Sequence, residues 1–430
     1  MAAAPARPDS LQGWLAYLET LHPQAIALGL ARVQQVLARL DIAFACPVVT
    51  IAGTNGKGST AALLAAILRA AGYRAGLYTS PHILRYNERV VVDGAEASDA
   101  ALCAAFGAVE SVRGDTPLTY FEFGTLAAFV HFSRQRLDAL VLEVGLGGRL
   151  DAVNAIDADI GVLTRVGIDH TDFLGDTREA IGYEKAGIFR AGRAAVVGER
   201  DIPASVVAHA TAIGATLVRL GLEYDYTDER MQWRYRGPGG ARYGLPVPAL
   251  RGTFQLANAA TALAVIDLLH ARLPVAAGAV RDGLVRVEWP ARFQVLAGRP
   301  LVVLDVAHNP QAAATLAATL GEMGFHPRTY AVFAALADKD VEGIVRAVAP
   351  RIDRWFVAST GGARGQPAAR LRERMATAGI DAGTIDASDD IATAFARAGD
   401  MASEADRIVV FGSFVTVAAV LAARAVTQAT

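Results

Sequence analysis

The sequence has few cysteines and little net charge, and each shortage excludes a class of protein. Cys46 and Cys103 are its two cysteines. They are too few for a disulfide framework and lack the spacing of metal ligands, so a reducing compartment is expected. The formal net charge is −2, so no overall basic charge attracts nucleic acid or an acidic membrane surface. An anionic substrate therefore requires local cations or backbone amides.

Long apolar runs are also missing, because none reaches the length of a membrane-spanning helix. The segment Met1 to Ser10 contains Arg7, Asp9 and two prolines, without an apolar core followed by a cleavage site. No signal peptide is therefore expected, and the protein is predicted to be cytoplasmic. Hydrophobic residues make up 53% and charged residues 20% of the chain, as in globular proteins. At 430 residues the chain exceeds one ordinary core, so two domains are expected.

Strands and helices alternate in the first part of the chain. Short apolar strands are predicted at Pro47 to Ala52, Ala139 to Val144 and Ile160 to Thr164, and a helix is predicted from Thr60 to Ala71. Buried parallel strands separated by helices are typical of a doubly wound α/β sheet. Between Tyr224 and Tyr243, alternating polarity and a glycine-rich turn predict a small antiparallel excursion.

The α/β alternation resumes after a helix that is predicted from Ala259 to Ala271. The strands expected there are Leu301 to Asp305, Tyr330 to Phe333, Trp355 to Ala358 and Ile408 to Phe411. We place the domain boundary close to Pro290. Residues 1–290 then form a doubly wound domain with a phosphate loop, and residues 291–430 form a smaller Rossmann-like α/β domain.

The strongest local signal is a glycine-rich turn between a strand and a helix. It reads Gly53-Thr54-Asn55-Gly56-Lys57-Gly58-Ser59-Thr60. Glycines let backbone N–H groups approach phosphate oxygens, and the helix N-terminus adds positive potential. Lys57 would neutralise the terminal phosphates, and Ser59 or Thr60 would reach them or a metal ion. The common phosphate-loop template does not fit, because Gly58 separates the lysine from the hydroxyls. A plain glycine turn would explain the glycines but neither the lysine nor the hydroxyls.

Glu143 ends an otherwise apolar strand downstream of this loop. Carboxylates are rarely left in such a place unless they bind or pair with a cation. A buried pair with an arginine is one explanation. Beside a phosphate loop, a magnesium ligand is favoured, because Mg²⁺ takes few protein oxygens in addition to phosphate and water.

The loop resembles the ATP site of the Mur ligase superfamily, and the closest match within it is the dihydrofolate synthase/folylpolyglutamate synthase family. Further stretches resemble that family in its order along the chain: Thr79 to His82, Asn87 to Arg89, Thr119 to Glu122, Leu142 to Asp151, Asp169 to Thr171, Glu184 to Ile188, Trp289 to Arg292 and Asp305 to Pro310. The resemblance implies an ATP-dependent ligase that joins an acid to an amino acid in folate biosynthesis.

The resemblance also implies two Mg²⁺ ions. Ser80 and Glu143 would hold one ion, and His170 would hold the second. The alternative for His170 is a plain surface residue, which a histidine in a loop more often is. The family's matching lysine is carbamylated, which makes Lys185 a candidate to support the metal cluster; the alternative is a surface lysine. Carbamylation needs a partly neutral amine, and therefore burial or cationic neighbours. The spacing of Asp176 and Glu179 predicts a capping box at the start of the helix that carries Lys185.

For the nucleotide, the resemblance implies contacts from both domains. The residues concerned are Thr54, Asn55, Gly56, Lys57, Gly58, Ser59 and Thr60 of the loop, Asn258 on the adenine side, Arg292 on the phosphates and Asp305 on the ribose. His308 would approach a phosphate. Closure of the two domains would then exclude water from a reactive acyl phosphate. The alternative for Asp305 is an ordinary strand–loop–helix with a solvated carboxylate. The expected catalytic residues are Lys57, His170, Lys185 and His308.

The resemblance assigns the pterin pocket to three segments. These are Ile26-Ala27-Leu28, Thr119-Tyr120-Phe121-Glu122 and Leu150-Asp151-Ala152. Tyr120 and Phe121 would stack on a flat bicyclic ring, and Asp151 would accept hydrogen bonds from pterin N–H groups. Simple core packing explains the two aromatic residues equally well.

The favoured function is a bifunctional ligase that adds L-glutamate to dihydropteroate and further glutamates to folates through an acyl phosphate. A dihydrofolate synthase without the second activity is close behind. A peptidoglycan ligase acting on UDP-muramyl peptides would share the loop and the second domain, and a nucleotide-dependent switch protein would share the loop alone. The protein is expected to be a monomer, and the sequence leaves open a requirement for a monovalent cation.

Overall fold

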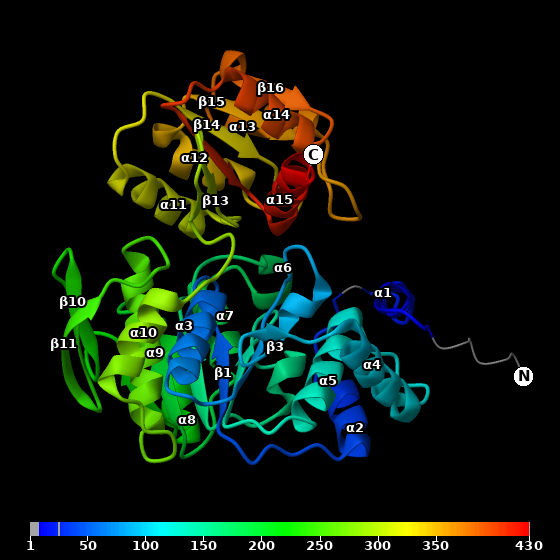
Figure 1. Ribbon diagram of the computed structural model, residues 1–430. Helices are drawn as coiled ribbons and strands as arrows, with labels where there is room; N and C mark the ends of the chain where they lie inside the picture. The colour runs from blue at the N-terminus through cyan, green and yellow to red at the C-terminus, as the bar shows by residue number, and fades with distance from the viewer. Residues whose placement is uncertain (1–7, 25, 430) are drawn as a thin grey trace, which may run out of the picture. The chain divides into compact units, whose positions relative to one another are not determined.

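The computed structural model describes residues 8–24 and 26–429. The sequence predicts no signal peptide from the segment Met1 to Ser10, and most of that segment lies outside the described residues. The chain folds into two compact units (Figure 1). One comprises the chain up to Ala249 and Leu256–Val287, and the other comprises Leu250–Gln255 and the chain from Glu288 onward. The sequence places the boundary close to Pro290, and the structure places it between Val287 and Glu288. The sequence did not indicate the separate assignment of Leu250–Gln255.

The first unit is built on an eight-stranded sheet with the strand order β4-β3-β2-β5-β1-β6-β7-β8. Its strands are β1 (Val48–Ala52), β2 (Ala75–Tyr78), β3 (Val90–Val92), β4 (Ala95–Glu96), β5 (Ala139–Glu143), β6 (Ile160–Leu163), β7 (Ala194–Val197) and β8 (Thr216–Arg219). From β2 to β8 all neighbours are parallel, whereas β3 and β4 add an antiparallel edge. This confirms the predicted doubly wound sheet.

The register brings the expected site residues to one edge of this sheet. In the pairing of β1 with β5, Ile51 is opposite Glu143, and β1 continues beside β6 up to Ala52 opposite Leu163. The carboxyl ends of parallel strands share one edge, and open α/β sheets bind their ligands there. The loops that follow β1, β2, β5 and β6 therefore meet at this edge.

The helices of the first unit fill the connections between its strands. They are α1 (Leu11–Thr20), α2 (Ala31–Leu40), α3 (Lys57–Ala70), α4 (Asp99–Arg113), α5 (Tyr120–Ser133), α6 (Thr171–Leu174), α7 (Arg178–Ala186), α8 (Ala204–Ile213), α9 (Phe254–Leu269) and α10 (Ala277–Arg286), with short 3₁₀ turns η1 (Tyr86–Arg89) and η2 (Ala152–Ala155). Helix α10 packs closely on α3, since a Cβ on Gly283 would lie 2.6 Å from the Cα of Ile67.

Three sequence predictions about these helices were wrong. Helix α3 begins at Lys57, so the lysine is its first residue and not part of the preceding turn. Helix α9 begins at Phe254, so Asn258 lies inside the helix and does not precede it. Helix α7 is capped by Thr177, whose side chain accepts from the N–H of Ala180. The carboxylate of Glu179 instead accepts from the N–H groups of Ala204 and Ser205, so the capping box does not form.

The antiparallel excursion forms a separate three-stranded sheet of β9 (Asp225–Asp228), β10 (Gln232–Gly237) and β11 (Gly240–Pro246). Tyr235 of this sheet is buried, and its hydroxyl donates to Asp267 of α9 over 2.8 Å. Arg242 pairs with the same carboxylate over 2.6 Å. These contacts hold the small sheet on α9 and confirm the predicted excursion.

The second unit is a smaller α/β domain with a six-stranded sheet in the order β12-β13-β17-β14-β15-β16. Its strands are β12 (Gln294–Leu296), β13 (Leu301–Leu304), β14 (Thr329–Phe333), β15 (Arg354–Ala358), β16 (Ile385–Ser388) and β17 (Arg407–Phe411). Its helices are α11 (Pro310–Glu322), α12 (Val341–Val348), α13 (Ala368–Thr377), α14 (Ile391–Met401) and α15 (Phe414–Ala429), with 3₁₀ turns η3 (Ala349–Arg351) and η4 (Ala382–Thr384). Strand β12 is antiparallel to β13, and the other neighbours are parallel.

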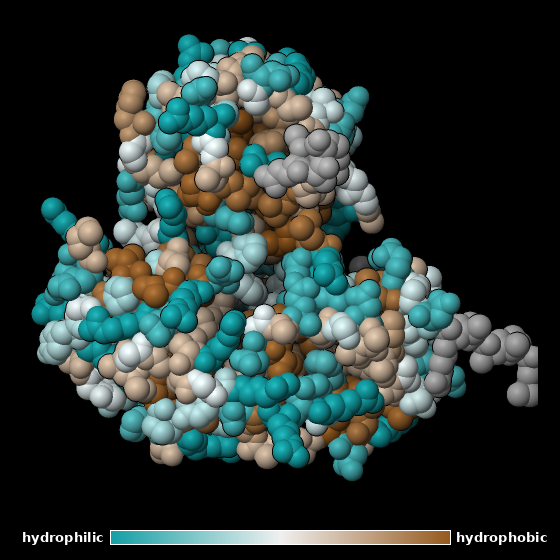
Figure 2. All heavy atoms as spheres, in the orientation of Figure 1, coloured by the Kyte–Doolittle hydropathy of each residue, from teal (hydrophilic) through white to brown (hydrophobic). Residues whose placement is uncertain are grey.

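In the described part of the chain, no helix is both long and apolar enough to cross a membrane. On the face shown in Figure 2, hydrophilic residues are interspersed with hydrophobic ones.

Candidate active site

The phosphate loop connects β1 to α3. Gly56, the residue before the helix, has a left-handed backbone (φ 92°), and a Cβ at this position would lie 2.8 Å from the side-chain oxygen of Asn258. Only glycine therefore suits this place, because the turn needs a positive φ and the amide of Asn258 lies against it. Asn258, predicted on the adenine side, is thus positioned next to the loop by α9.

Lys57 opens α3 with its amine turned back over the loop. Its Nζ donates to the carbonyl of Gly53 over 2.9 Å and to that of Thr54 over 3.3 Å. The hydroxyl of Thr60 is buried and has no hydrogen-bond partner among the described residues. A positive amine, a hydroxyl and the N-terminus of a 14-residue helix thus lie together, and this combination suits phosphate oxygens.

Glu143 and Ser80 meet at the same edge of the sheet. Glu143 ends β5, its side chain is 4% exposed, and its Oε2 accepts from the N–H of Ser80 over 3.4 Å. Ser80 follows β2, the neighbour of β5. No group of three or more His, Cys, Asp or Glu side chains in the described residues is placed to hold a metal ion. One carboxylate and one hydroxyl beside a phosphate loop nevertheless fit Mg²⁺, which completes its shell with phosphate and water.

Lys185 is buried at the end of α7, with 4% of its surface exposed. Burial and, to a smaller extent, the positive charge of Lys57 lower its pKa to about 7, whereas Asp169 and Asp151 act in the opposite sense. The alternative of a plain surface lysine is therefore wrong. At neutral pH about half of such an amine is uncharged, which is the form that reacts with CO₂.

His170 lies in the loop between β6 and α6, in the left-handed conformation (φ 54°), and its N–H donates to the carboxylate of Asp169 over 2.9 Å. A residue other than glycine keeps this conformation only where its surroundings fix it, and such residues cluster at functional sites. The charge of Asp169 also acts on Lys185, so the loop of His170 belongs to the same neighbourhood as Lys57 and Lys185.

The three segments assigned to the pterin pocket lie together in the first unit. Arg32 pairs with Glu122 over 2.7 Å and donates to the carbonyl of Ala27 over 2.7 Å. The N–H of Gly29 donates to the carbonyl of Leu150 over 3.2 Å. The early loop around Ile26, Ala27 and Leu28 is thereby bound to the start of α5 and to the loop before η2.

Thr119 and Glu122 serve the fold. They form a capping box at the start of α5, in which the hydroxyl of Thr119 accepts from the N–H of Glu122 and the carboxylate of Glu122 accepts from the N–H of Thr119. Phe121 covers the glycine after Val144, because a Cβ on Gly145 would lie 2.5 Å from the tip of its ring. The ring of Tyr78 lies 6.3 Å from that of Phe121, so Phe121 contacts both the sheet and the loop that follows β5.

Asp151 is buried and caps η2. Its carboxylate accepts from the N–H groups of Leu146 over 2.8 Å and Val153 over 3.0 Å. Burial raises its pKa to about 6, although these hydrogen bonds and the charge of Lys57 favour the ionised form. Its oxygens thus hold the loop in place, and contacts of Leu150, Asp151 and Ala152 with a pterin stay predictions.

Three predicted nucleotide residues lie in the second unit. Asp305 follows β13, and its carboxylate accepts from the N–H groups of Phe293 over 2.8 Å and Ala307 over 2.7 Å. Burial raises its pKa, while the charge of Arg292 lowers it. The guanidinium of Arg292 lies 5.2 Å from the centre of the Phe414 ring, and the His308 ring lies 6.1 Å from the same ring. These residues form one cluster, and their contacts with a nucleotide stay predictions.

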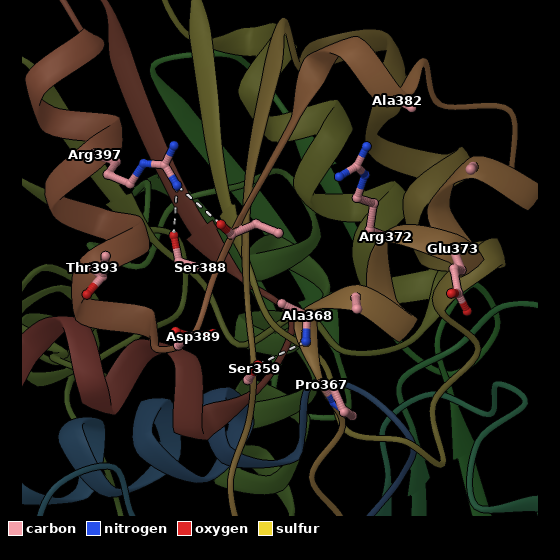
Figure 3. Close-up of a pocket in the computed structure, with 13 residues that line it drawn as sticks. Ser359, Pro367, Ala368, Arg372, Glu373, Ala382, Ser388, Asp389, Thr393 and Arg397 are labelled. Atoms are coloured by element: carbon pink, nitrogen blue, oxygen red, sulfur yellow. Dashed lines mark hydrogen bonds between the residues drawn. The ribbon is translucent and has the colours of Figure 1, made fainter.

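A cavity of about 710 Å³ opens elsewhere in the second unit, between α13 and α14 (Figure 3). Arg397 reaches the Ala387 carbonyl and the Ser388 hydroxyl there, over 3.2 and 3.4 Å. None of the predicted site residues lines this cavity.

Sequence reasoning missed residues that organise the site without standing in a recognisable motif. Arg32 binds two of the pterin segments, and Asn154 donates from its side chain to the carbonyls of Arg149 and Gly187, over 3.1 and 3.0 Å. The hydrogen bond from Asn154 to Gly187 joins the Asp151 loop to the end of α7, the helix that carries Lys185. The capping-box spacing of Thr119 and Glu122 was a visible signal for a structural role.

Comparison with known proteins identifies the class. The Mur ligase middle domain matches residues 51–266, and the Mur ligase glutamate ligase domain matches residues 291–414. The dihydrofolate synthase/folylpolyglutamate synthase of Escherichia coli (strain K12) is 44% identical over 418 residues, which cover 97% of this chain and 96% of that protein. The chain therefore belongs to the Mur ligases, and within them to the dihydrofolate synthase/folylpolyglutamate synthase family.

Solved structures give the same result. The structure of E. coli FolC in complex with DHPP and ADP has a TM-score of 0.93 and 43% identity, and the match covers 99% of this chain and 100% of that one. A bifunctional folylpolyglutamate synthase/dihydrofolate synthase with Mn, AMPPNP and L-glutamate bound has a TM-score of 0.90 and 44% identity, with coverage of 98% and 100%. These matches confirm the predicted fold class of two α/β domains.

Proposed function

We propose that this chain uses ATP and Mg²⁺ to join L-glutamate to the carboxylate of dihydropteroate, and that it also extends folates by further glutamates. The observation that carries the proposal is the meeting of Lys57, Glu143 and the partly neutral Lys185 at one edge of the sheet. Family membership and the ligands of its relatives, which include ADP, AMPPNP, Mn and L-glutamate, support ATP-dependent glutamate ligation.

In the first step, an oxygen of the substrate carboxylate attacks the γ-phosphorus of ATP, and ADP leaves. Lys57 and the N–H groups at the start of α3 face the charge that develops on the phosphate oxygens. The residues that would hold a divalent ion are Ser80 and Glu143, with His170 and Lys185 at a second position. Bound Mg²⁺ would offset the negative charge of the transferring phosphoryl group.

In the second step, the amine of glutamate attacks the acyl phosphate, the carbon–nitrogen bond forms, and inorganic phosphate leaves with one oxygen of the original carboxylate. The amine loses a proton in this step, and water accepts it. His170 and Lys185 are the residues that we propose to orient the amine, with Lys185 carbamylated. Arg292, Asp305 and His308 are proposed to bind the nucleotide, as is Asn258.

For the acid substrate, we propose that the pocket is formed by the segments that Arg32 and Gly29 hold together. Tyr120 and Phe121 offer aromatic faces, and the buried Asp151 offers the lone pairs that its backbone contacts leave. Both cysteines are free, which fits the cytoplasm expected from the sequence. A monomeric state and a monovalent-cation requirement stay predictions.

The experiment supplies the purified chain with ATP, Mg²⁺ and L-glutamate, and with dihydropteroate or tetrahydrofolate in separate reactions. ADP release and the amide product are measured together. Products from both acids support the bifunctional enzyme, and product from dihydropteroate alone supports a dihydrofolate synthase. If only a UDP-muramyl substrate gives ADP and an amide, the folate assignment is refuted.

A further inference from the structure

The side chain of Thr54 binds the loop that carries His170 to the phosphate loop. Its hydroxyl donates to the carbonyl of Gly167 over 3.0 Å and accepts from the N–H of the same residue over 3.0 Å. The N–H of Thr54 also donates to the carbonyl of Arg165 over 2.6 Å. Strands β1 and β6 end their pairing at Ala52 and Leu163. The side chain of Thr54 therefore links the loops after β1 and β6, just beyond the point where the two strands stop pairing.

Neighbouring contacts reinforce this junction. The hydroxyl of Thr164 donates to the carbonyl of Asn55 over 2.8 Å, and it occupies the place where a Cβ on Gly53 would lie. On the other side of the loop, Val166 donates to Glu199 over 3.0 Å and accepts from Arg178 over 3.1 Å. The backbone of residues 165–167 is thus held from both sides, just before His170.

We propose that the hydroxyl of Thr54 is a positioning group, which fixes the His170 loop against the phosphate loop. The sequence assigned Thr54 to the nucleotide, but the donor and one acceptor of its hydroxyl are used within the protein. The N–H of Thr54 is also used within the protein, in the bond to the carbonyl of Arg165. Thr54 then acts on the reaction through His170. It keeps the site for the second divalent ion at a fixed position relative to Lys57. This inference rests on the role proposed for His170.

The test compares Thr54→Val, which keeps the shape but removes the hydroxyl, with Thr54→Ser, which keeps the hydroxyl. For Thr54→Val we expect kcat to fall about tenfold and the Mg²⁺ concentration for half-activation to rise by a similar factor, as when a group that orients a metal ligand is removed. Nucleotide affinity, measured by calorimetry, should change by less than about threefold because the loop amides remain. Thr54→Ser should behave like the wild type.

A readout on the protein without metal or substrate keeps the test independent of turnover. Hydrogen exchange should be slow at the N–H of Gly167 in the wild type and in Thr54→Ser. In Thr54→Val it should become faster at Gly167 and unchanged within α3, whose internal bonds are not altered. Equal protection of Gly167 in all three proteins would overturn the proposal, even if the valine variant is less stable overall.

A double variant shows whether Thr54 acts through His170. In a His170→Ala background, Thr54→Val should cause little further loss of kcat, because both changes remove the same arrangement. Losses that multiply would contradict the inference. If the wild type forms no amide from any acid, the proposed function fails, whereas the exchange measurement still decides whether the hydroxyl holds the loop.

Discussion

Replacing Lys185 by methionine removes a buried cation without leaving a large cavity, and we expect the fold to become more stable while turnover is lost. The pKa of Lys185 falls from 10.5 to about 7 on folding. The folded state therefore binds the proton more weakly than the unfolded chain. Each pKa unit corresponds to about 1.36 kcal/mol, so the lowered pKa costs the fold about 4 kcal/mol at pH 7.

The sign of this effect gives it a characteristic pH dependence. Between about pH 7 and pH 10.5 the unfolded chain binds more protons than the folded chain, so wild-type stability rises with pH. The free energy of unfolding of Lys185→Met should therefore exceed that of the wild type by about 4 kcal/mol at pH 7 and by about 2 kcal/mol at pH 9. Urea denaturation of both proteins at pH 6, 7, 8 and 9, without bicarbonate or metal, measures this difference.

Lys185→Arg is the matched control, because arginine keeps its charge throughout this range. It should be less stable than the wild type at every pH. Two results would refute the reasoning: a methionine variant less stable than the wild type at pH 7, or an advantage that does not change with pH. Either would mean that the amine of Lys185 is not held in a partly neutral state.

Lys57→Ala should reduce turnover about 100-fold or more, because it removes a preorganised charge from the phosphate loop; near-normal rates with unchanged stability would show that the lysine does not face the transferring phosphate. Glu143→Gln should raise the Mg²⁺ concentration for half-activation and lower kcat together, and a mutant that saturates at the wild-type concentration would make Glu143 structural. Glu122→Ala should cost about 3 kcal/mol in urea denaturation, because Arg32 loses the partner of a largely buried ion pair; a loss below about 1 kcal/mol would mean that the pair is unimportant for stability.

The sequence predicted the features that depend on the pattern of neighbouring residues, such as strands and the polar residues that end them. The apolar strand predicted at Ala139 to Val144 was found as β5 (Ala139–Glu143), because a fully buried parallel strand needs an unbroken apolar run. Glu143 was notable because it interrupts that pattern at a strand end. The structure places the loops after β1, β2, β5 and β6 at one edge of the sheet, although the sequence analysis did not predict strand β2.

What the sequence did not reveal depends on contacts between distant segments. Helix α3 starts at Lys57 because the backbone of Gly56 is left-handed. The hydrophobic periodicity of the sequence does not mark this start. The capping box at Asp176 failed because Glu179 reaches the backbone of Ala204 and Ser205, which lie in another helix. The burial of Lys185 and the ion pair of Arg32 also require knowledge of the fold, since neither residue has an unusual local sequence.

We propose that ATP activates the acid through an acyl phosphate, and the transfer of an oxygen isotope can reveal this intermediate. Dihydropteroate labelled with ¹⁸O in its carboxylate is incubated with the wild-type chain, ATP, Mg²⁺ and L-glutamate, and the inorganic phosphate is examined by mass spectrometry. If an acyl phosphate forms, each phosphate released carries one labelled oxygen. Amide formation with unlabelled phosphate would contradict it.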